Sequence, residues 1–112
     1  MNALFVELPP FSRYRQTYLD DDAYHQLQLL LLQQPEAGDV IKDTGGLRKL
    51  RFADSRRGKG KRGGLRVIYY WWISGEQFWL FTLYDKNEMA DLSTNERKLL
   101  RTLLENELKA RS

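Results

Sequence analysis

The chain has 112 residues, no cysteine, one histidine, and 18 Lys and Arg against 15 Asp and Glu, a net charge of +3. This length fits one domain over residues 1–112, and the lack of cysteine excludes a disulfide framework and any thiolate metal site, while fitting a cytoplasmic protein. A single histidine excludes a multi-histidine metal site or a two-histidine acid–base pair within one chain, and no apolar run approaches the roughly 18 residues of a membrane helix.

The N-terminal part of the chain predicts one strand followed by two helices. The segment Ala3–Leu8 is apolar apart from Glu7 and predicts a strand, and no basic region precedes it, so we do not expect a signal peptide. Aromatic residues at helical spacing predict a short helix over Pro10–Tyr18. Aspartates that favour a helix start precede an apolar stripe over Asp21–Gln34, and Pro35 ends this second helix.

The middle of the chain predicts three strands and two loops. Residues 35–46 are rich in Pro, Gly and Asp and predict a loop, and Leu47–Ala53 alternates apolar and basic residues as a half-buried strand does. Four glycines among five bases in residues 54–64 predict an exposed loop. The two aromatic and β-branched runs that follow, Leu65–Ile73 and Gln77–Tyr84, predict central strands joined as a hairpin.

A capping box starts the last predicted helix. Ser93 and Glu96 have the S-x-x-E spacing, and leucines at helical spacing continue to about Lys109. The predicted element order is therefore β-α-α-β-β-β-α. This order predicts an α+β fold in which a small, antiparallel-rich sheet of about four strands has helices packed on one face.

The basic residues are concentrated in one segment. Residues 48–66 hold nine basic residues and one acidic residue, a net charge of +8, whereas the other 93 residues hold nine basic and fourteen acidic residues, a net charge of −5. Such asymmetry favours a polyanionic partner for one surface rather than a generally basic protein. The alternative is a solvated basic loop that binds no ligand.

Alternation along the predicted strands gathers basic side chains on one surface. Lys49 and Arg51 share one face of their strand, and Arg66 and Tyr70 share one face of the next. Lys86 follows the last strand and has the same parity, provided that the strand runs on. A cationic surface with aromatic neighbours suits a nucleic-acid backbone and an unstacked base. The simpler interpretation is that Lys49 and Arg51 form the solvent face of a half-buried strand.

This surface has the residues to cleave RNA without a metal or another cofactor, because the 2′-hydroxyl of RNA can attack the adjacent phosphorus. Arg51 and Arg66 would hold the phosphate and stabilise charge on its oxygens. Lys49 is the candidate base, since neighbouring cations favour a neutral amine. Lys86 would supply charge or a proton near the leaving group.

Three other titratable residues are interpreted as structural. His25 lies in a predicted helix and is expected to be a surface or packing residue. Glu88 and Asp91 precede the last helix, where an acid favours the helix N-terminus; a catalytic carboxylate is the alternative.

Three motifs follow one another from residue 45 to residue 88: Gly45-Gly46-Leu47-Arg48-Lys49-Leu50-Arg51, then Lys59-Gly60-Lys61-Arg62-Gly63-Gly64-Leu65-Arg66-Val67-Ile68-Tyr69-Tyr70, then Leu83-Tyr84-Asp85-Lys86-Asn87-Glu88. Together they resemble the RelE superfamily of bacterial toxins and, more narrowly, the HigB-type toxins of type II toxin–antitoxin systems. The likeness covers nearly the whole chain and includes the element order. It implies a RelE-like fold and a ribosome-dependent endoribonuclease that cleaves mRNA in the A site by metal-independent 2′-hydroxyl attack, leaving a 2′,3′-cyclic phosphate and inhibiting translation.

The resemblance also implies roles for individual residues. By position, Lys49 and Arg51 match the basic pair on the family's second strand, Arg66 matches the arginine of the third, and Lys86 matches the basic residue after the fourth. The family's base-stacking tyrosine near the C-terminus aligns with Leu92. Two tyrosines could replace this stacking residue, Tyr70 and Tyr84. The remaining expected RNA contacts are the five basic residues of the 54–64 loop: Arg56, Arg57, Lys59, Lys61 and Arg62.

The partners implied are a cognate antitoxin with a helix-turn-helix domain, the 70S ribosome and mRNA. Operator DNA would be contacted only through the antitoxin, and no membrane partner or cofactor is expected. Two alternatives stay open: a ParE-like inhibitor of DNA gyrase with the same fold, and a non-catalytic RNA- or ribosome-binding module whose affinity depends strongly on salt. The set of predicted catalytic residues favours the nuclease, because a pure inhibitor needs no phosphate-binding surface.

Overall fold

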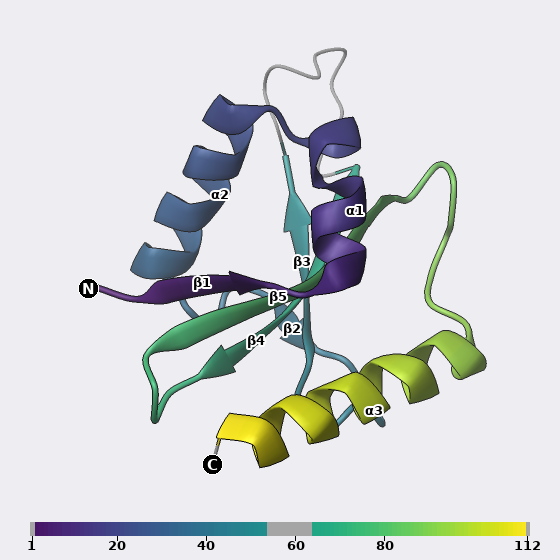
Figure 1. Cartoon of the computed structure of the whole chain (residues 1–112). Helices are drawn as coiled ribbons and strands as arrows, with labels where there is room; N and C mark the ends of the chain where they lie inside the picture. Colours follow the sequence, from purple (N-terminus) through teal and green to yellow (C-terminus); the bar gives the residue numbers. More distant parts are fainter. Residues whose placement is uncertain (1, 54–63, 112) are drawn as a thin grey trace.

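Five strands and three helices form the part of the chain that the computed structural model describes, residues 2–53 and 64–111 (Figure 1). In chain order the elements are β1 (Leu4–Glu7), α1 (Pro9–Tyr18), α2 (Asp21–Gln33), β2 (Asp39–Val40), β3 (Arg48–Phe52), β4 (Leu65–Trp72), β5 (Gln77–Asp85) and α3 (Thr94–Arg111). This order confirms the expected α+β class and adds the short strand β2 to the expected series. Within these residues, no helix has both the length and the apolar character needed to span a bilayer.

The strands lie in one mixed sheet in the order β1-β5-β4-β3-β2. β1 pairs with β5 in parallel, and the other three pairings are antiparallel. A parallel pair needs a long crossover, and here the two helices α1 and α2 lie in the chain between β1 and the rest of the sheet. In this strand order β4 and β5 lie inside the sheet, with a strand on each side, so other elements must cover both of their faces.

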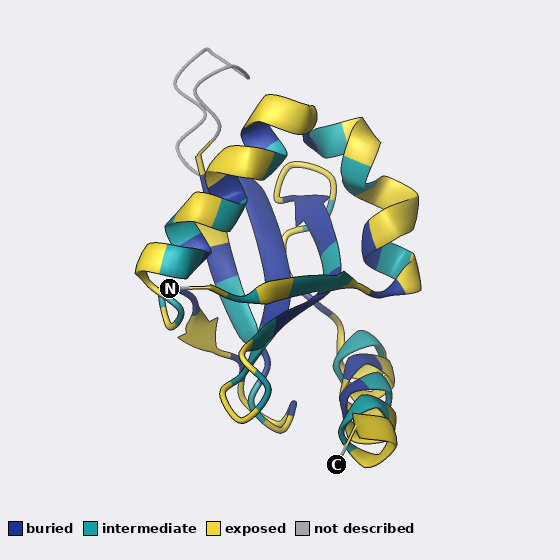
Figure 2. Cartoon of the chain, turned by 60° about the vertical axis from the view of Figure 1, so that its left-hand side comes forward, coloured by how far each residue is buried: buried dark blue, intermediate teal, exposed yellow. Residues whose placement is uncertain are grey.

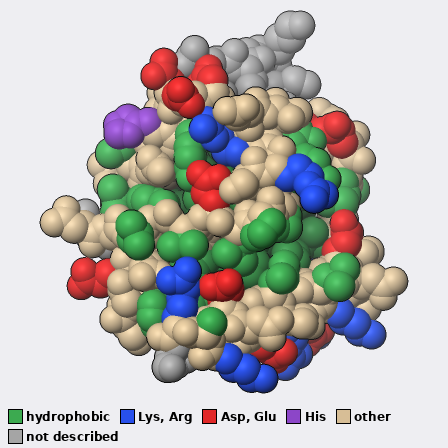
Figure 3. Space-filling model, in the orientation of Figure 1, with side chains coloured by type: hydrophobic (Ala, Val, Ile, Leu, Met, Phe, Trp, Pro, Cys, Tyr) green, Lys and Arg blue, Asp and Glu red, His purple; other side chains and the backbone are tan. Residues whose placement is uncertain are grey.

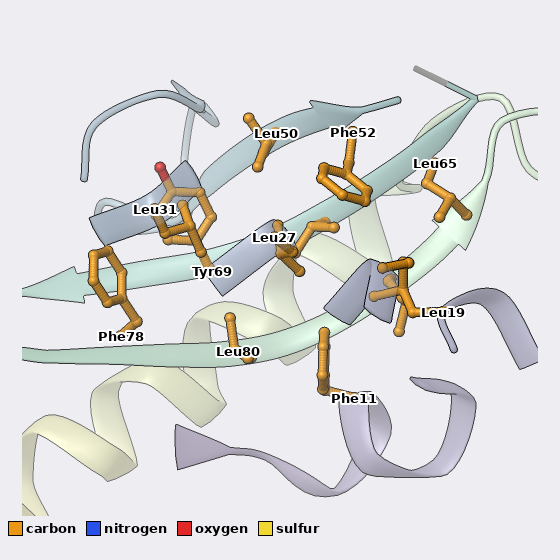
Figure 4. Packing of buried hydrophobic residues seen from close by; sticks show 13 residues of the cluster. Phe11, Leu19, Leu27, Leu31, Leu50, Phe52, Leu65, Tyr69, Phe78 and Leu80 are labelled. Atoms are coloured by element: carbon orange, nitrogen blue, oxygen red, sulfur yellow. The ribbon is translucent and has the colours of Figure 1, made fainter. Parts of the chain in front are cut away.

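The helices α1 and α2 cover one face of the sheet. Ala23, Leu27 and Leu31 recur every four residues and are the buried residues of α2, so they line one side of this helix. They pack with Leu50 of β3 and Leu80 of β5 in one cluster (Figure 4). Full burial of each such leucine contributes about 1.5–3 kcal/mol, so this face holds one of the two cores of the protein.

The helix α3 covers the opposite face, so the helices lie on both faces of the sheet rather than on one as expected. Leu100 and Leu104 of α3 belong to a second cluster with Ile68 of β4 and Trp79 and Phe81 of β5. The central strands β4 and β5 are mostly buried between the helices, whose outward sides are exposed (Figure 2). The reason is that β4 is apolar on both faces over most of its length, and helices on one face alone would leave the other face in water.

The sheet has five strands rather than about four because Asp39–Val40, expected to lie in a loop, pairs with β3 at the edge. The segment before this edge strand is tied to the centre of the sheet by one tyrosine. The hydroxyl of Tyr69 donates to the carbonyl of Pro35 at 2.8 Å and accepts from the N–H of Gly38 at 3.0 Å. A buried hydroxyl thus holds the chain where β2 begins.

Candidate functional site

Three of the predicted basic residues share the face of the sheet that α3 covers. In the strand register, Arg51 of β3 lies opposite Arg66 of β4, and Arg66 lies opposite Tyr84 of β5. Lys49 lies opposite Ile68, which belongs to the cluster that packs with α3. Lys49 and Arg51 are two residues apart in one strand, so their side chains point to the same face. We call Lys49, Arg51 and Arg66 the basic face.

The turn before β3 positions this face. Gly45 and Gly46 have φ angles of 83° and 118°, which residues with a side chain rarely adopt. A Cβ on Gly46 would also lie 3.3 Å from Cε1 of Tyr70. The N–H of Ile41 donates to the carbonyl of Leu47 at 2.8 Å and closes the turn. The two glycines of the first motif therefore set the point at which β3 enters the sheet.

The three side chains of the basic face differ in burial. Arg66 is 9% exposed, and Nη1 of its guanidinium donates to the carbonyl of Leu65 at 3.3 Å. Lys49 is half-buried, and Arg51 is exposed. Because a guanidinium is planar and carries its donors in a rigid fork, Arg66 supplies a fixed charge at the base of the site, whereas Arg51 is accessible to a ligand from solvent.

The start of α3 brings two further charged residues to the basic face. Nζ of Lys49 lies 3.4 Å from Oδ1 of Asp91, and Nη2 of Arg97 lies 3.4 Å from Oδ2 of Asp91. A hydrogen bond from the N–H of Leu92, together with the charges of Lys49 and Arg97, lowers the pKa of the Asp91 carboxyl. The ionised carboxylate therefore connects β3 to α3.

Sequence reasoning missed Arg97, although its spacing gave a signal. Arg97 precedes Leu100 by three residues and Leu104 by seven, so it lies on the side of α3 that faces the sheet. The expected capping box is confirmed: the N–H of Ser93 donates to Oε1 of Glu96 at 2.8 Å, and the N–H of Glu96 donates to Oγ of Ser93 at 3.1 Å. The box fixes where α3 begins and therefore where Arg97 lies.

A hollow of about 280 Å³ opens at these residues. Its lining contains one acidic residue, Asp39, and two apolar residues, Val40 and Ile41. The other four lining residues are basic: Lys42, Lys49, Arg51 and Arg97. This excess of positive charge suits a small anion such as a phosphate group. Within residues 2–53 and 64–111, no three His, Cys, Asp or Glu side chains lie close enough together to hold a metal ion.

The two candidate tyrosines pack against the same face. Tyr84 is 5% exposed, and among the described residues its hydroxyl has no hydrogen-bond partner. Burial, followed by the nearby charge of Asp91, raises the pKa of Tyr84. Tyr70 is half-buried, with its ring centroid 5.4 Å from that of Trp79. Tyr84 thus offers no open ring face for stacking in this conformation, and RNA contact by either tyrosine stays a prediction.

The other predicted residues are not brought to the basic face by the sheet. β5 ends at Asp85, so strand alternation does not extend to Lys86, which is exposed and whose N–H donates to the carbonyl of Gly64 at 2.9 Å. The role of Lys86 stays a prediction. Five predicted RNA contacts lie outside the described residues: Arg56, Arg57, Lys59, Lys61 and Arg62.

Charges are mixed on the surface seen in Figure 3, where basic and acidic side chains are interspersed around apolar area. A second hollow, of about 360 Å³, is mainly apolar, with Pro10 of α1 on one side and Leu92 with residues of α3 on the other. It contains no basic side chain. Of these two hollows, the one at the basic face therefore has the chemistry for a phosphate.

No protein-family model matches the chain. Among solved structures, a mutant of the E. coli toxin RelE in the free state matches with a TM-score of 0.52 and 14% identity, over 80% of this chain and 90% of its own. The isolated E. coli RelE toxin matches with a TM-score of 0.51 and 14% identity, over 91% of this chain and 99% of its own. A chain of the intact E. coli RelBE toxin–antitoxin complex matches with a TM-score of 0.51 and 14% identity, over 75% of this chain and 96% of its own. This chain therefore has the fold of the RelE toxin.

Proposed function

We propose that this protein is the toxin of a type II toxin–antitoxin system, of the HigB type, and that it cleaves mRNA in the ribosomal A site. The observation that carries the proposal is the row formed by Arg51, Arg66 and Tyr84 across three neighbouring strands, with Lys49 on the same face. The RelE fold and the three sequence motifs support the same function. A fold alone does not imply an activity, so the residues of the basic face are the critical part of the argument.

The reaction proposed is attack of a 2′-hydroxyl on the adjacent phosphorus. A bond forms between the 2′-oxygen and phosphorus, the bond from phosphorus to the 5′-oxygen breaks, and a 2′,3′-cyclic phosphate and a 5′-hydroxyl result. Arg51 and Arg66 stabilise the negative charge on the phosphoryl oxygens. Lys49 takes the proton of the 2′-hydroxyl once its amine is no longer paired with Asp91, and Lys86 gives a proton to the departing 5′-oxygen.

The partners proposed follow from this activity. The ribosome and mRNA are the targets, in the cytoplasm, and a cognate antitoxin with a helix-turn-helix domain neutralises the toxin and connects it to operator DNA. The similarity to a chain of the RelBE toxin–antitoxin complex supports an antitoxin partner.

Cleavage of mRNA on programmed 70S ribosomes tests the proposal. We expect the purified protein to cut mRNA only when ribosomes are present, and Arg51→Ala to lower the rate by about 10²–10³-fold, because one donor to the phosphoryl oxygens is lost. Arg51 is the better test position than Arg66, since it is exposed and its removal leaves the core intact. The matched control is Arg13→Ala, which removes an exposed arginine from α1, on the other side of the sheet.

Two outcomes would count against the nuclease. Cleavage by Arg51→Ala at the rate of Arg13→Ala would remove the basic face from the mechanism. A folded protein that binds ribosomes without cutting mRNA would instead indicate a binding module, and inhibition of DNA gyrase would then be the next activity to measure.

A further inference from the structure

The carboxylate of Asp91 lies between two cations that come from different elements. It is 3.4 Å from Nζ of Lys49 on β3 and 3.4 Å from Nη2 of Arg97 on α3. All three side chains are partly exposed, at 29% for Lys49, 49% for Asp91 and 32% for Arg97. Exposed ion pairs at this separation contribute little to stability, so another anion can replace the carboxylate at low cost.

Two buried donors close to this carboxylate have no hydrogen-bond acceptor among the described residues. Within the described residues, Nε of Arg97 and the hydroxyl of Tyr84 are buried without a hydrogen-bond partner. Lys49 and Arg97 also line the hollow of about 280 Å³, together with Lys42 and Arg51. A buried donor without an acceptor is costly, and a group with several acceptor oxygens would remove that cost.

We infer that Arg97 is the cation of a binding subsite for one RNA phosphate beside Lys49, and that the Asp91 carboxylate occupies this subsite in the free protein. When RNA binds, Asp91 leaves both Arg97 and Lys49, the proposed base. Arg97 is then a substrate-binding residue that pairs with phosphate oxygens through its forked donors, and Asp91 is an internal competitor of the substrate. The identity of the ligand rests on the proposed function, whereas the anion subsite rests on the geometry of these three residues.

Binding of a single-stranded RNA oligonucleotide with 2′-O-methyl groups tests the inference by fluorescence anisotropy. This probe cannot be cut by 2′-hydroxyl attack, and the assay contains no ribosome. We expect Arg97→Gln to weaken binding several-fold and to reduce the slope of log K against log salt by about 0.7, the share of one phosphate contact. We expect Asp91→Asn to tighten binding by about twofold to fivefold, because the probe no longer displaces a charged competitor.

The chain offers a matched ion pair on the same helix as a control. Nε of Arg101 lies 3.4 Å from Oε2 of Glu105, and both residues are exposed. Arg101→Gln and Glu105→Gln make the same charge changes away from the hollow and are expected to leave affinity and salt slope unchanged. Asp39→Asn removes a charge from the lining of the hollow without breaking an ion pair to Arg97, so it measures the general electrostatic effect.

The subsite is overturned if Arg97→Gln binds the probe as Arg101→Gln does, or if Asp91→Asn binds no more tightly than Asp39→Asn. Thermal melting by circular dichroism shows whether each variant is folded, and Arg97→Lys, which keeps the charge but loses the forked donors, should retain part of the affinity. If the protein shows these binding effects but never cuts mRNA, the subsite is supported and the proposed nuclease activity is refuted. If the protein cuts mRNA but shows none of these binding effects, the nuclease activity is supported and the subsite is refuted.

Discussion

The hydroxyl of Tyr69 makes two hydrogen bonds to the backbone of the segment that precedes β2. It donates to the carbonyl of Pro35 and accepts from the N–H of Gly38, while the residue as a whole is fully buried. The backbone approaches the ring so closely that a Cβ on Gly38 would lie 2.9 Å from Cε1 of Tyr69. A side chain of β4 thus helps to hold the edge of the sheet next to the hollow.

Tyr69→Phe should lower the free energy of unfolding by about 1–3 kcal/mol, because it leaves a buried N–H and a carbonyl without their partner. Urea denaturation measures this difference. Tyr14→Phe is the control, since Tyr14 is exposed and its loss should change stability little. Equal stability of the two variants would show that the Pro35–Gly38 segment is held by other contacts.

The helix α3 is the element that completes the candidate site. Its leucines cover the second face of the sheet, and its first turn carries Arg97 to the basic face. Packing of the helix and placement of the site charges are therefore coupled, because one rigid element does both. The two sides of α3 differ sharply: Leu104 is 1% exposed, whereas Leu99 is 67% exposed.

Leu104→Ala should destabilise the protein by about 2–5 kcal/mol, since it opens a cavity under α3. Leu99→Ala changes the same residue type in the same helix and should stay within about 0.5 kcal/mol of the wild type. Chemical denaturation of both variants makes the comparison. If Leu104→Ala were as stable as Leu99→Ala, α3 would not pack on the sheet as described.

At the scale of the whole molecule, two buried tyrosines and the half-buried Tyr24 predict a loss of stability at alkaline pH. Burial is the largest cause that raises the pKa of Tyr24, Tyr69 and Tyr84, and the hydroxyl of Tyr24 also donates to Oε2 of Glu7 at 2.8 Å. A pKa raised in the folded state means that the folded protein holds these protons more tightly than the unfolded chain. The stabilisation is fully present below the unfolded pKa of about 10 and is lost as the pH rises above it.

Urea denaturation at pH 9 and at pH 11 should show this loss. Tyr24→Phe removes one of the three protons and should make the decrease in unfolding free energy between the two pH values smaller. Tyr14→Phe again serves as the control, because Tyr14 is exposed. A decrease that is the same in Tyr24→Phe and in the wild type would assign the alkaline loss to other groups.

Local patterns in the sequence were sufficient to predict the helices, the strands other than β2, and the common face of the basic strand residues. The capping box at Ser93 and the alternation around Lys49 and Arg51 act between residues a few positions apart, so they can be recognised without knowing the fold. Alternation in a strand has a strict period of two, which is why the common face of the basic strand residues followed from the sequence. Whether these residues act on RNA stays a prediction.

The tertiary structure alone decided which surfaces meet. Lys49 and Asp91 are 42 residues apart in the chain, and no local pattern states that they form an ion pair. The parallel pairing of β1 with β5 and the position of α3 on the second face are likewise long-range outcomes. Burial of apolar surface has no direction, so an apolar stripe predicts that a face is covered but not by which element. Arg97 contacts the basic face because α3, and not another element, covers the second face of the sheet.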